Sequence, residues 1–104
     1  MAYKVLITSD AENVLEGFVS YLLFEKRNEQ AAKSLLDDFE LTKKNLERVA
    51  GSLKYCENPR LRELGYKRIN FISHRYFILY RIEENTVIVD YIFHQLQDYE
   101  NKFN

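Results

Sequence analysis

The sequence has few of the residues that cross-link or interrupt a fold. Cys56 is the single cysteine among 104 residues, so the chain can build neither an intramolecular disulfide nor a cysteine zinc cluster. Only one proline and three glycines are present, while 46% of the residues are hydrophobic and 14% are aromatic, which excludes the composition of a disordered segment. We therefore expect one compact domain, residues 1–104, suited to a reducing compartment.

Long apolar runs are also missing. The longest stretches, such as Phe77–Tyr80, are far too short to cross a bilayer. The first ten residues lack the apolar core and the cleavage site of a secretory signal. The sequence predicts a cytoplasmic protein with no membrane partner.

A net charge of −1 conceals an uneven distribution of charged residues. The segment Lys54–Arg81 contains seven basic and two acidic residues, whereas the first fifty residues contain seven basic and nine acidic ones. Phosphate binding needs local positive charge rather than a basic chain as a whole. Function is therefore expected in the segment Lys54–Arg81.

The first half of the chain predicts a strand followed by a helical hairpin. Tyr3–Ile7 has strand character and runs into Ser9–Glu12, which has the spacing of a capping box. Apolar residues then recur at intervals of three and four as far as Lys26. A second helix should begin after Asn28 and end at Gly51, close enough to the first to pack antiparallel with it.

The second half predicts a three-stranded meander. Ser52–Glu63 reads as an irregular loop, and Tyr66–Ile72, Arg75–Ile82 and Thr86–His94 read as strands. The segment Gln95–Asn104 could add a helical turn. The fold class is α+β in the order β-α-α-β-β-β(-α), with the hairpin packed on one face of a small, mainly antiparallel sheet. The opposite face of the sheet should be free to bind a partner, and the arginines should lie on that face or along its rim.

Several pieces of the sequence, in this order and spacing, carry a resemblance. They are Tyr3–Val5 with Thr8 and Ala11, the helix around Tyr21, Leu61–Leu64, Gly65–Ile69, Tyr76–Ile82, Val87–Val89 and His94–Tyr99. Over almost its whole length the chain resembles the RelE/ParE family of bacterial type II toxin–antitoxin modules. The resemblance implies growth inhibition that a cognate antitoxin protein suppresses.

Two activities follow from the resemblance, and the fold does not choose between them. RelE-like members are mRNA interferases, endoribonucleases that cleave messenger RNA on the ribosome, whereas ParE-like members inhibit DNA gyrase without cutting nucleic acid. A third hypothesis is a decayed toxin that retains only antitoxin binding. Our first hypothesis is the metal-independent, RNA-binding endonuclease. The sequence does not decide whether the protein forms a homodimer.

Metal-free RNA cleavage needs a group that activates the ribose 2′-hydroxyl, a cation for the phosphate and an acid for the leaving oxygen. His94 ends the last strand, where RelE-like nucleases place a catalytic histidine or arginine, although a histidine there can also simply cap the strand. Those nucleases often carry an arginine where Phe77 stands here, a departure that favours the gyrase alternative. The candidate catalytic residues are His94, Arg75, Tyr99 and Arg68.

Further basic residues could bind nucleic acid through charge, or could simply be solvated. Lys67 and Arg68 are adjacent and therefore point to opposite faces, Arg68 being the one expected to avoid the apolar face. Arg75 and Arg81, separated by an even number, should share a face. Asp90 and Asp98 do not form a credible metal centre, no glycine-rich phosphate loop is present, and no cofactor is expected. The candidate nucleic-acid-binding residues are Lys67, Arg81, His74, Arg60 and Arg62.

Overall fold

The computed structural model describes residues 2–97, 99 and 103. Its elements are β1 (Lys4–Ile7), α1 (Ser9–Ser20), the π-helical turn η1 (Tyr21–Glu25), α2 (Glu29–Val49), the 3₁₀ turn η2 (Ala50–Ser52), α3 (Pro59–Glu63), β2 (Lys67–Asn70), β3 (Tyr76–Glu83) and β4 (Thr86–His94). Among the described residues, no helix is both long and apolar enough to span a membrane.

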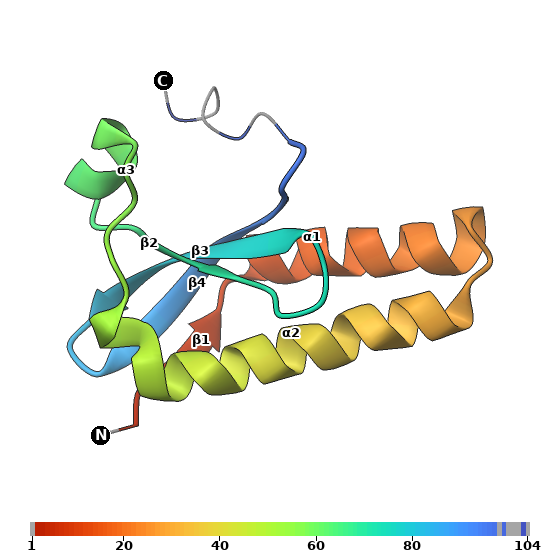
Figure 1. The fold of residues 1–104 in the computed structure, drawn as a ribbon, viewed down its shortest axis with the longest axis horizontal. Coiled ribbons are helices and arrows are strands. Elements are labelled where there is room, and N and C mark those ends of the chain that lie inside the picture. Colours follow the sequence, from red (N-terminus) through yellow and green to blue (C-terminus); the bar gives the residue numbers. More distant parts are fainter. Residues whose placement is uncertain (1, 98, 100–102, 104) are drawn as a thin grey trace.

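The four strands form one mixed sheet in the order β1-β4-β3-β2 (Figure 1). β2, β3 and β4 form an antiparallel meander, and β1 adds to β4 in parallel after the two long helices have crossed the sheet. The predicted α+β class and element order are confirmed. The strand predicted at Thr86–His94 has those bounds, and its neighbours are shifted or shortened by a few residues.

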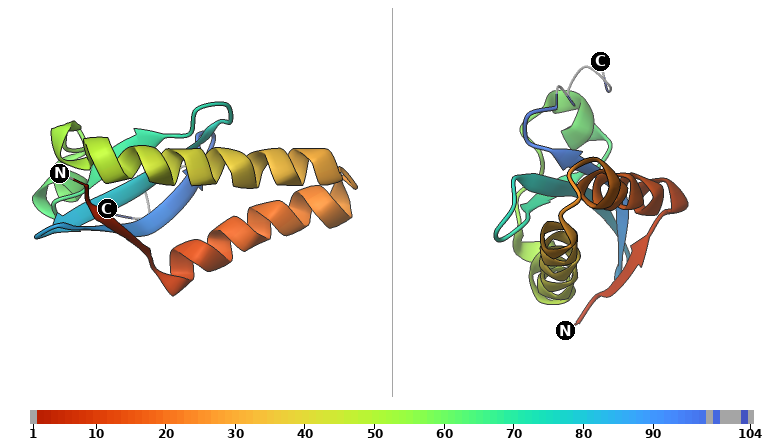
Figure 2. Two further views of the ribbon diagram at one scale, coloured as in Figure 1. Left: turned by 90° about the horizontal axis from the view of Figure 1, so that it is seen from below. Right: turned by 90° about the vertical axis from the view of Figure 1, so that its right-hand side faces the viewer.

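The helical hairpin lies along one face of the sheet, and its connecting end projects beyond the strands (Figures 1 and 2). The hydroxyl of Thr8 accepts a hydrogen bond from the Ala11 backbone N–H at 3.2 Å, so the first helix is capped one residue earlier than the predicted box at Ser9. The side chain of Asn28 caps α2 as predicted, at 3.0 Å from the Ala31 nitrogen. Both helices therefore begin at local side-chain caps.

The core under the hairpin is mostly aliphatic. Strand side chains that point toward the helices, together with the inner sides of α1 and α2, make one buried cluster; its members include Ala11, Leu15, Leu35, Phe39, Leu46, Ile78, Tyr80, Val87, Val89 and Ile92. We call this side of the sheet the helix face. Tyr80 is fully buried, and its hydroxyl donates to the Ala50 carbonyl at 2.8 Å.

The opposite side, the outer face, is not bare, which corrects the expectation of a free sheet face. A second cluster covers much of it; its buried members are Leu61, Tyr66, Phe77, Leu79 and Phe93, with Tyr91, Tyr99 and Phe103 packed against them. The predicted loop at Ser52–Glu63 contains α3, because Asn58 caps the turn and Pro59 suits its first position. The predicted helical turn at Gln95–Asn104 lies partly outside the described residues.

Candidate functional site

Arg68 and Tyr99 meet on the outer face. The Arg68 guanidinium lies 3.8 Å from the centroid of the Phe77 ring, and its Nη1 donates to the Tyr99 hydroxyl at 3.4 Å. The Tyr99 ring packs edge-on against Phe77 as well. Strand alternation places the neighbouring Lys67 on the other side, as predicted, where it is buried and donates to the Leu53 carbonyl. Two of the four predicted catalytic residues are therefore in contact.

Arg81 lies on the same face and forms ion pairs with carboxylates. A β-bulge leaves Asp90 without a partner in the β3–β4 register, since Leu79 pairs with Tyr91 and Tyr80 with Val89. Asp90 accepts from Arg81 Nε at 2.7 Å and from the Tyr66 hydroxyl at 2.9 Å, and Glu83 binds the other end of the guanidinium. Arg81 thus has two carboxylate partners already.

These contacts shift two pKa values in this network. The hydrogen bond to Asp90 raises the pKa of Arg81 above its ordinary value. Burial, reinforced by the hydrogen bond to the Asp90 carboxylate, raises the pKa of the Tyr66 hydroxyl. Arg81 and Tyr66 therefore keep their protons, which suits a structural network better than proton transfer.

His94 lies across the sheet from Arg68 and Tyr99. It is the register partner of Tyr76, and directly paired residues point to the same face. Its ring packs edge-on against Tyr76 at 4.9 Å, and its Nδ1 accepts a hydrogen bond from the Leu96 N–H at 3.1 Å. The two rings also line a groove of about 590 Å³. Its hairpin side is formed by Val14, Gly17, Phe18 and Tyr21.

Arg75 lies next to the Tyr76–His94 pair along the backbone. It precedes β3 and is exposed, and its backbone carbonyl accepts a hydrogen bond from the Gln95 N–H at 2.8 Å. Within the predicted catalytic set His94, Arg75, Tyr99 and Arg68, the side chains of Arg68 and Tyr99 are in contact, and His94 lies on the opposite face of the sheet.

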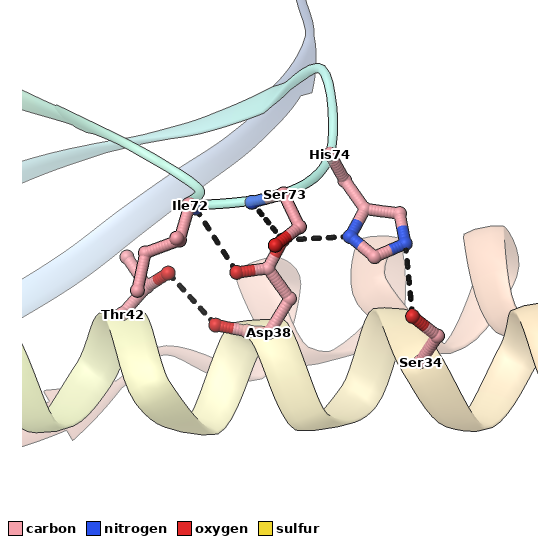
Figure 3. Close-up of polar contacts among 6 residues, drawn as sticks. All are labelled: Ser34, Asp38, Thr42, Ile72, Ser73 and His74. Carbon is pink, nitrogen blue, oxygen red and sulfur yellow. Dashed lines mark hydrogen bonds and ion pairs between the residues drawn. The ribbon is translucent and has the colours of Figure 1, made fainter.

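His74 belongs to a polar clip between α2 and the turn that joins β2 to β3 (Figure 3). Asp38, almost completely buried, accepts hydrogen bonds from the N–H groups of Ile72 and Ser73 and from His74 Nδ1 at 2.6 Å. His74 Nε2 lies 3.4 Å from the Ser34 hydroxyl. Burial alone would raise the pKa of Asp38, but the bonds from His74, Ser73 and Ile72 outweigh it and hold the pKa below its ordinary value.

The contacts run from Ser34 to His74 to Asp38, as they do in hydrolytic triads. The group is nevertheless a poor hydrolase site. Ser34 lies inside α2, where the neighbouring N–H groups are spent in the helix and cannot stabilise an oxyanion. We interpret the group as a structural clip. Sequence reasoning missed Asp38, although an acidic residue on the buried stripe between Leu35 and Thr42 was a signal that could have revealed it.

The two arginines of α3 differ in their surroundings. Arg62 donates to the carbonyls of Cys56 and Glu57 and so fixes the preceding loop. Arg60 is exposed and lies 3.9 Å from Glu63. Of the predicted nucleic-acid-binding residues, Lys67, Arg62, Arg81 and His74 therefore make contacts within the fold, and Arg60 remains a surface charge. Among the described residues, no group of three or more histidine, cysteine, aspartate or glutamate side chains could hold a metal ion.

A helical hairpin on a mixed sheet, with a first strand that adds in parallel and an outer face carrying arginine and tyrosine, defines a small α+β protein. The family model described as "ParE toxin of type II toxin-antitoxin system, parDE" matches residues 5–99. The chain therefore belongs to the ParE toxin family of type II toxin–antitoxin systems, and a cognate antitoxin is its implied partner.

A solved structure described as the chromosomal ParDE TA system from P. aeruginosa shares the fold. Its TM-score is 0.71 at 16% sequence identity, and the alignment covers 89% of this chain and 96% of the other. No curated protein matches the sequence.

Proposed function

We propose that this toxin inhibits DNA gyrase by binding it and does not cut RNA itself. The observation that carries the proposal is the placement of His94 on the opposite side of the sheet from Arg68 and Tyr99. The family assignment agrees, because ParE-like members of the RelE/ParE group act on gyrase without nuclease chemistry.

Metal-free RNA cleavage needs its base, its acid and its phosphate-binding cation around one phosphodiester, each within hydrogen-bond reach. His94 instead has one ring nitrogen committed to the Leu96 N–H, and its ring borders an apolar groove along α1. The cation and the hydroxyl on the outer face thus lack the histidine that was expected to move the proton.

The helical hairpin offers a surface suited to a protein target. Val14, Tyr21 and Phe24 are exposed along α1 and η1, and Phe24 is 74% exposed at the projecting end of the hairpin. Exposed aromatic and aliphatic side chains favour protein contacts, whereas nucleic acid binding favours a basic surface. This supports gyrase, or the antitoxin, as the macromolecule that touches the hairpin.

The deciding experiment compares wild type with His94→Ala in two assays. Purified wild-type toxin at micromolar concentration should inhibit supercoiling by gyrase, and His94→Ala should still inhibit it, because no proton transfer by His94 is required. Induced expression should stop growth without new 5′ ends in translated messenger RNA. Unchanged supercoiling, or new 5′ ends that disappear in His94→Ala, would overturn the proposal.

A ribosome-dependent messenger-RNA endonuclease is the second candidate, favoured by the contact between Arg68 and Tyr99. The same RNA mapping tests it, with Arg68→Gln as the added variant. Normal growth on expression without the antitoxin would instead support the decayed, antitoxin-binding module.

A further inference from the structure

A cleft of about 350 Å³ opens on the outer face beside β2. Its walls come from the segment that joins η2 to α3, from β2 and from Tyr99. The side chains that matter for its chemistry are Lys54, Tyr55, Asn58, Arg68, Asn70 and Tyr99. None of the hairpin residues proposed to contact gyrase lines it.

The charge of the cleft is positive. Arg68 and Lys54 contribute two cations, and Glu57 contributes the one carboxylate in the lining. Within the described part of the chain, Arg68 forms no ion pair, in contrast to Arg81 with its two carboxylates. Arg68 donates a hydrogen bond from Nε to the Asn70 Oδ1 and another from Nη1 to the Tyr99 hydroxyl. The hydrogens of Nη2 are left to bind a ligand.

Two asparagines, Asn58 and Asn70, also line the cleft. The Oδ1 of Asn58 accepts from the N–H groups of Arg60 and Leu61, and the Oδ1 of Asn70 accepts from Arg68 Nε. Because each amide oxygen already accepts a hydrogen bond, the NH₂ group is the part of each amide that can still donate to a ligand. The lining therefore combines cations with neutral donors, the combination that binds oxyanions.

Two features add shape to this chemistry. The Arg68 guanidinium lies over the Phe77 ring at 3.8 Å, and its bonds to Asn70 and Tyr99 fix the direction of its donors. The Lys67 ammonium packs against one side of the Tyr55 ring, 4.1 Å from the ring centroid. Tyr55 is 54% exposed. An exposed ring at the rim of an anion site can stack on a base.

We infer that this cleft binds the phosphate of a nucleotide. Arg68 and Lys54 pair with the phosphate oxygens, the amides of Asn58 and Asn70 donate to them, and the base stacks on Tyr55. The site binds without cleaving, because His94 lies on the far side of the sheet. It is a second binding site, separate from the apolar surface of the hairpin.

Calorimetric titration of the full-length toxin with adenosine 5′-monophosphate, inorganic phosphate and adenosine tests the inference. Adenosine monophosphate should bind more tightly than phosphate. Arg68→Gln should weaken its binding by roughly tenfold or more, and Lys54→Gln should weaken it by a smaller factor. Tyr55→Ala should weaken binding of the nucleotide but not that of phosphate.

Arg60→Gln is the matched control, since it removes an equal charge from an exposed arginine outside the cleft. Thermal melting checks that each variant is folded; if Arg68→Gln is not, Lys54→Gln decides. The inference is overturned by an absence of nucleotide binding, by variants of the cleft that bind as wild type does, or by an equal loss in Arg60→Gln. Equal binding of phosphate and nucleotide, insensitive to Tyr55→Ala, would leave free phosphate as the ligand and overturn the nucleotide assignment.

Discussion

Each face of the sheet carries a polar network built around one aspartate, and the two networks differ in burial. On the helix face, the Asp38 side chain is 3% exposed and accepts from two backbone N–H groups and from His74 (Figure 3). On the outer face, the Asp90 side chain is 16% exposed and accepts from Arg81 and Tyr66. The first network joins two elements far apart in the sequence, whereas the second lies mostly along neighbouring strands.

This difference separates a structural role from a surface role. A buried carboxylate that satisfies backbone donors is costly to remove, because those donors are then left without partners. A partly exposed ion pair contributes less, because water and salt screen it. Loss of Asp38 should therefore loosen the β2–β3 turn from α2, and loss of the Arg81 ion pairs should leave the fold almost unchanged.

The largest effect is expected from Asp38→Ala. The change leaves the N–H groups of Ile72 and Ser73 without their acceptor and should lower the free energy of unfolding by about 2–4 kcal/mol. Urea denaturation measures it. Asp37→Ala, an exposed neighbour on the same helix, should change stability by less than about 0.5 kcal/mol. Equal midpoints for the two variants would contradict the structural role of the clip.

A smaller effect is expected from Arg81→Gln. Its guanidinium is partly exposed, so losing its bonds to Asp90 and Glu83 should cost roughly 1 kcal/mol or less. Arg75→Gln removes the same charge from an exposed position and provides the control. The effect of Arg81→Gln should shrink in high salt, and a loss comparable to that of Asp38→Ala would erase the distinction between the two faces.

Local sequence signals predicted most of the fold. Alternation and turn residues indicated the meander, and the apolar spacing of the helices indicated the hairpin and the capping role of Asn28. The same signals missed α3, because a five-residue helix has too few turns to show a period. They also assigned the first cap to Ser9 rather than to Thr8, a one-residue difference that capping patterns do not resolve.

The candidate site was less predictable, because its geometry depends on contacts across the sheet. Alternation correctly separated Lys67 from Arg68. It could not show that a bulge at Asp90 would provide a partner for Arg81, or that His94 would pair with Tyr76 on the helix face. The outer face was expected to be free because the aromatic packing of Tyr99 over Phe77 arises only in the folded chain.

The smallest expected effect is the pH dependence of the stability that the Asp38 carboxylate contributes. Because the hydrogen bonds from His74, Ser73 and Ile72 hold the pKa of Asp38 below its ordinary value, the carboxylate favours the folded state when it is ionised. That contribution is fully present above the ordinary aspartate pKa of about 4, and it is lost as pH falls through the lower pKa of the folded state. In acid, the free energy of unfolding of wild type should therefore fall toward that of Asp38→Asn.

The measurement is the difference in unfolding free energy between wild type and Asp38→Asn, followed from neutral pH into acid. The difference should narrow as pH falls below about 4, since only wild type carries the carboxylate of Asp38. Asp37→Asn controls for the loss of one negative charge from the same helix. A difference in unfolding free energy that stays constant into strong acid would contradict the prediction. The charge of the Asp38 carboxylate would then contribute nothing to holding the β2–β3 turn against α2.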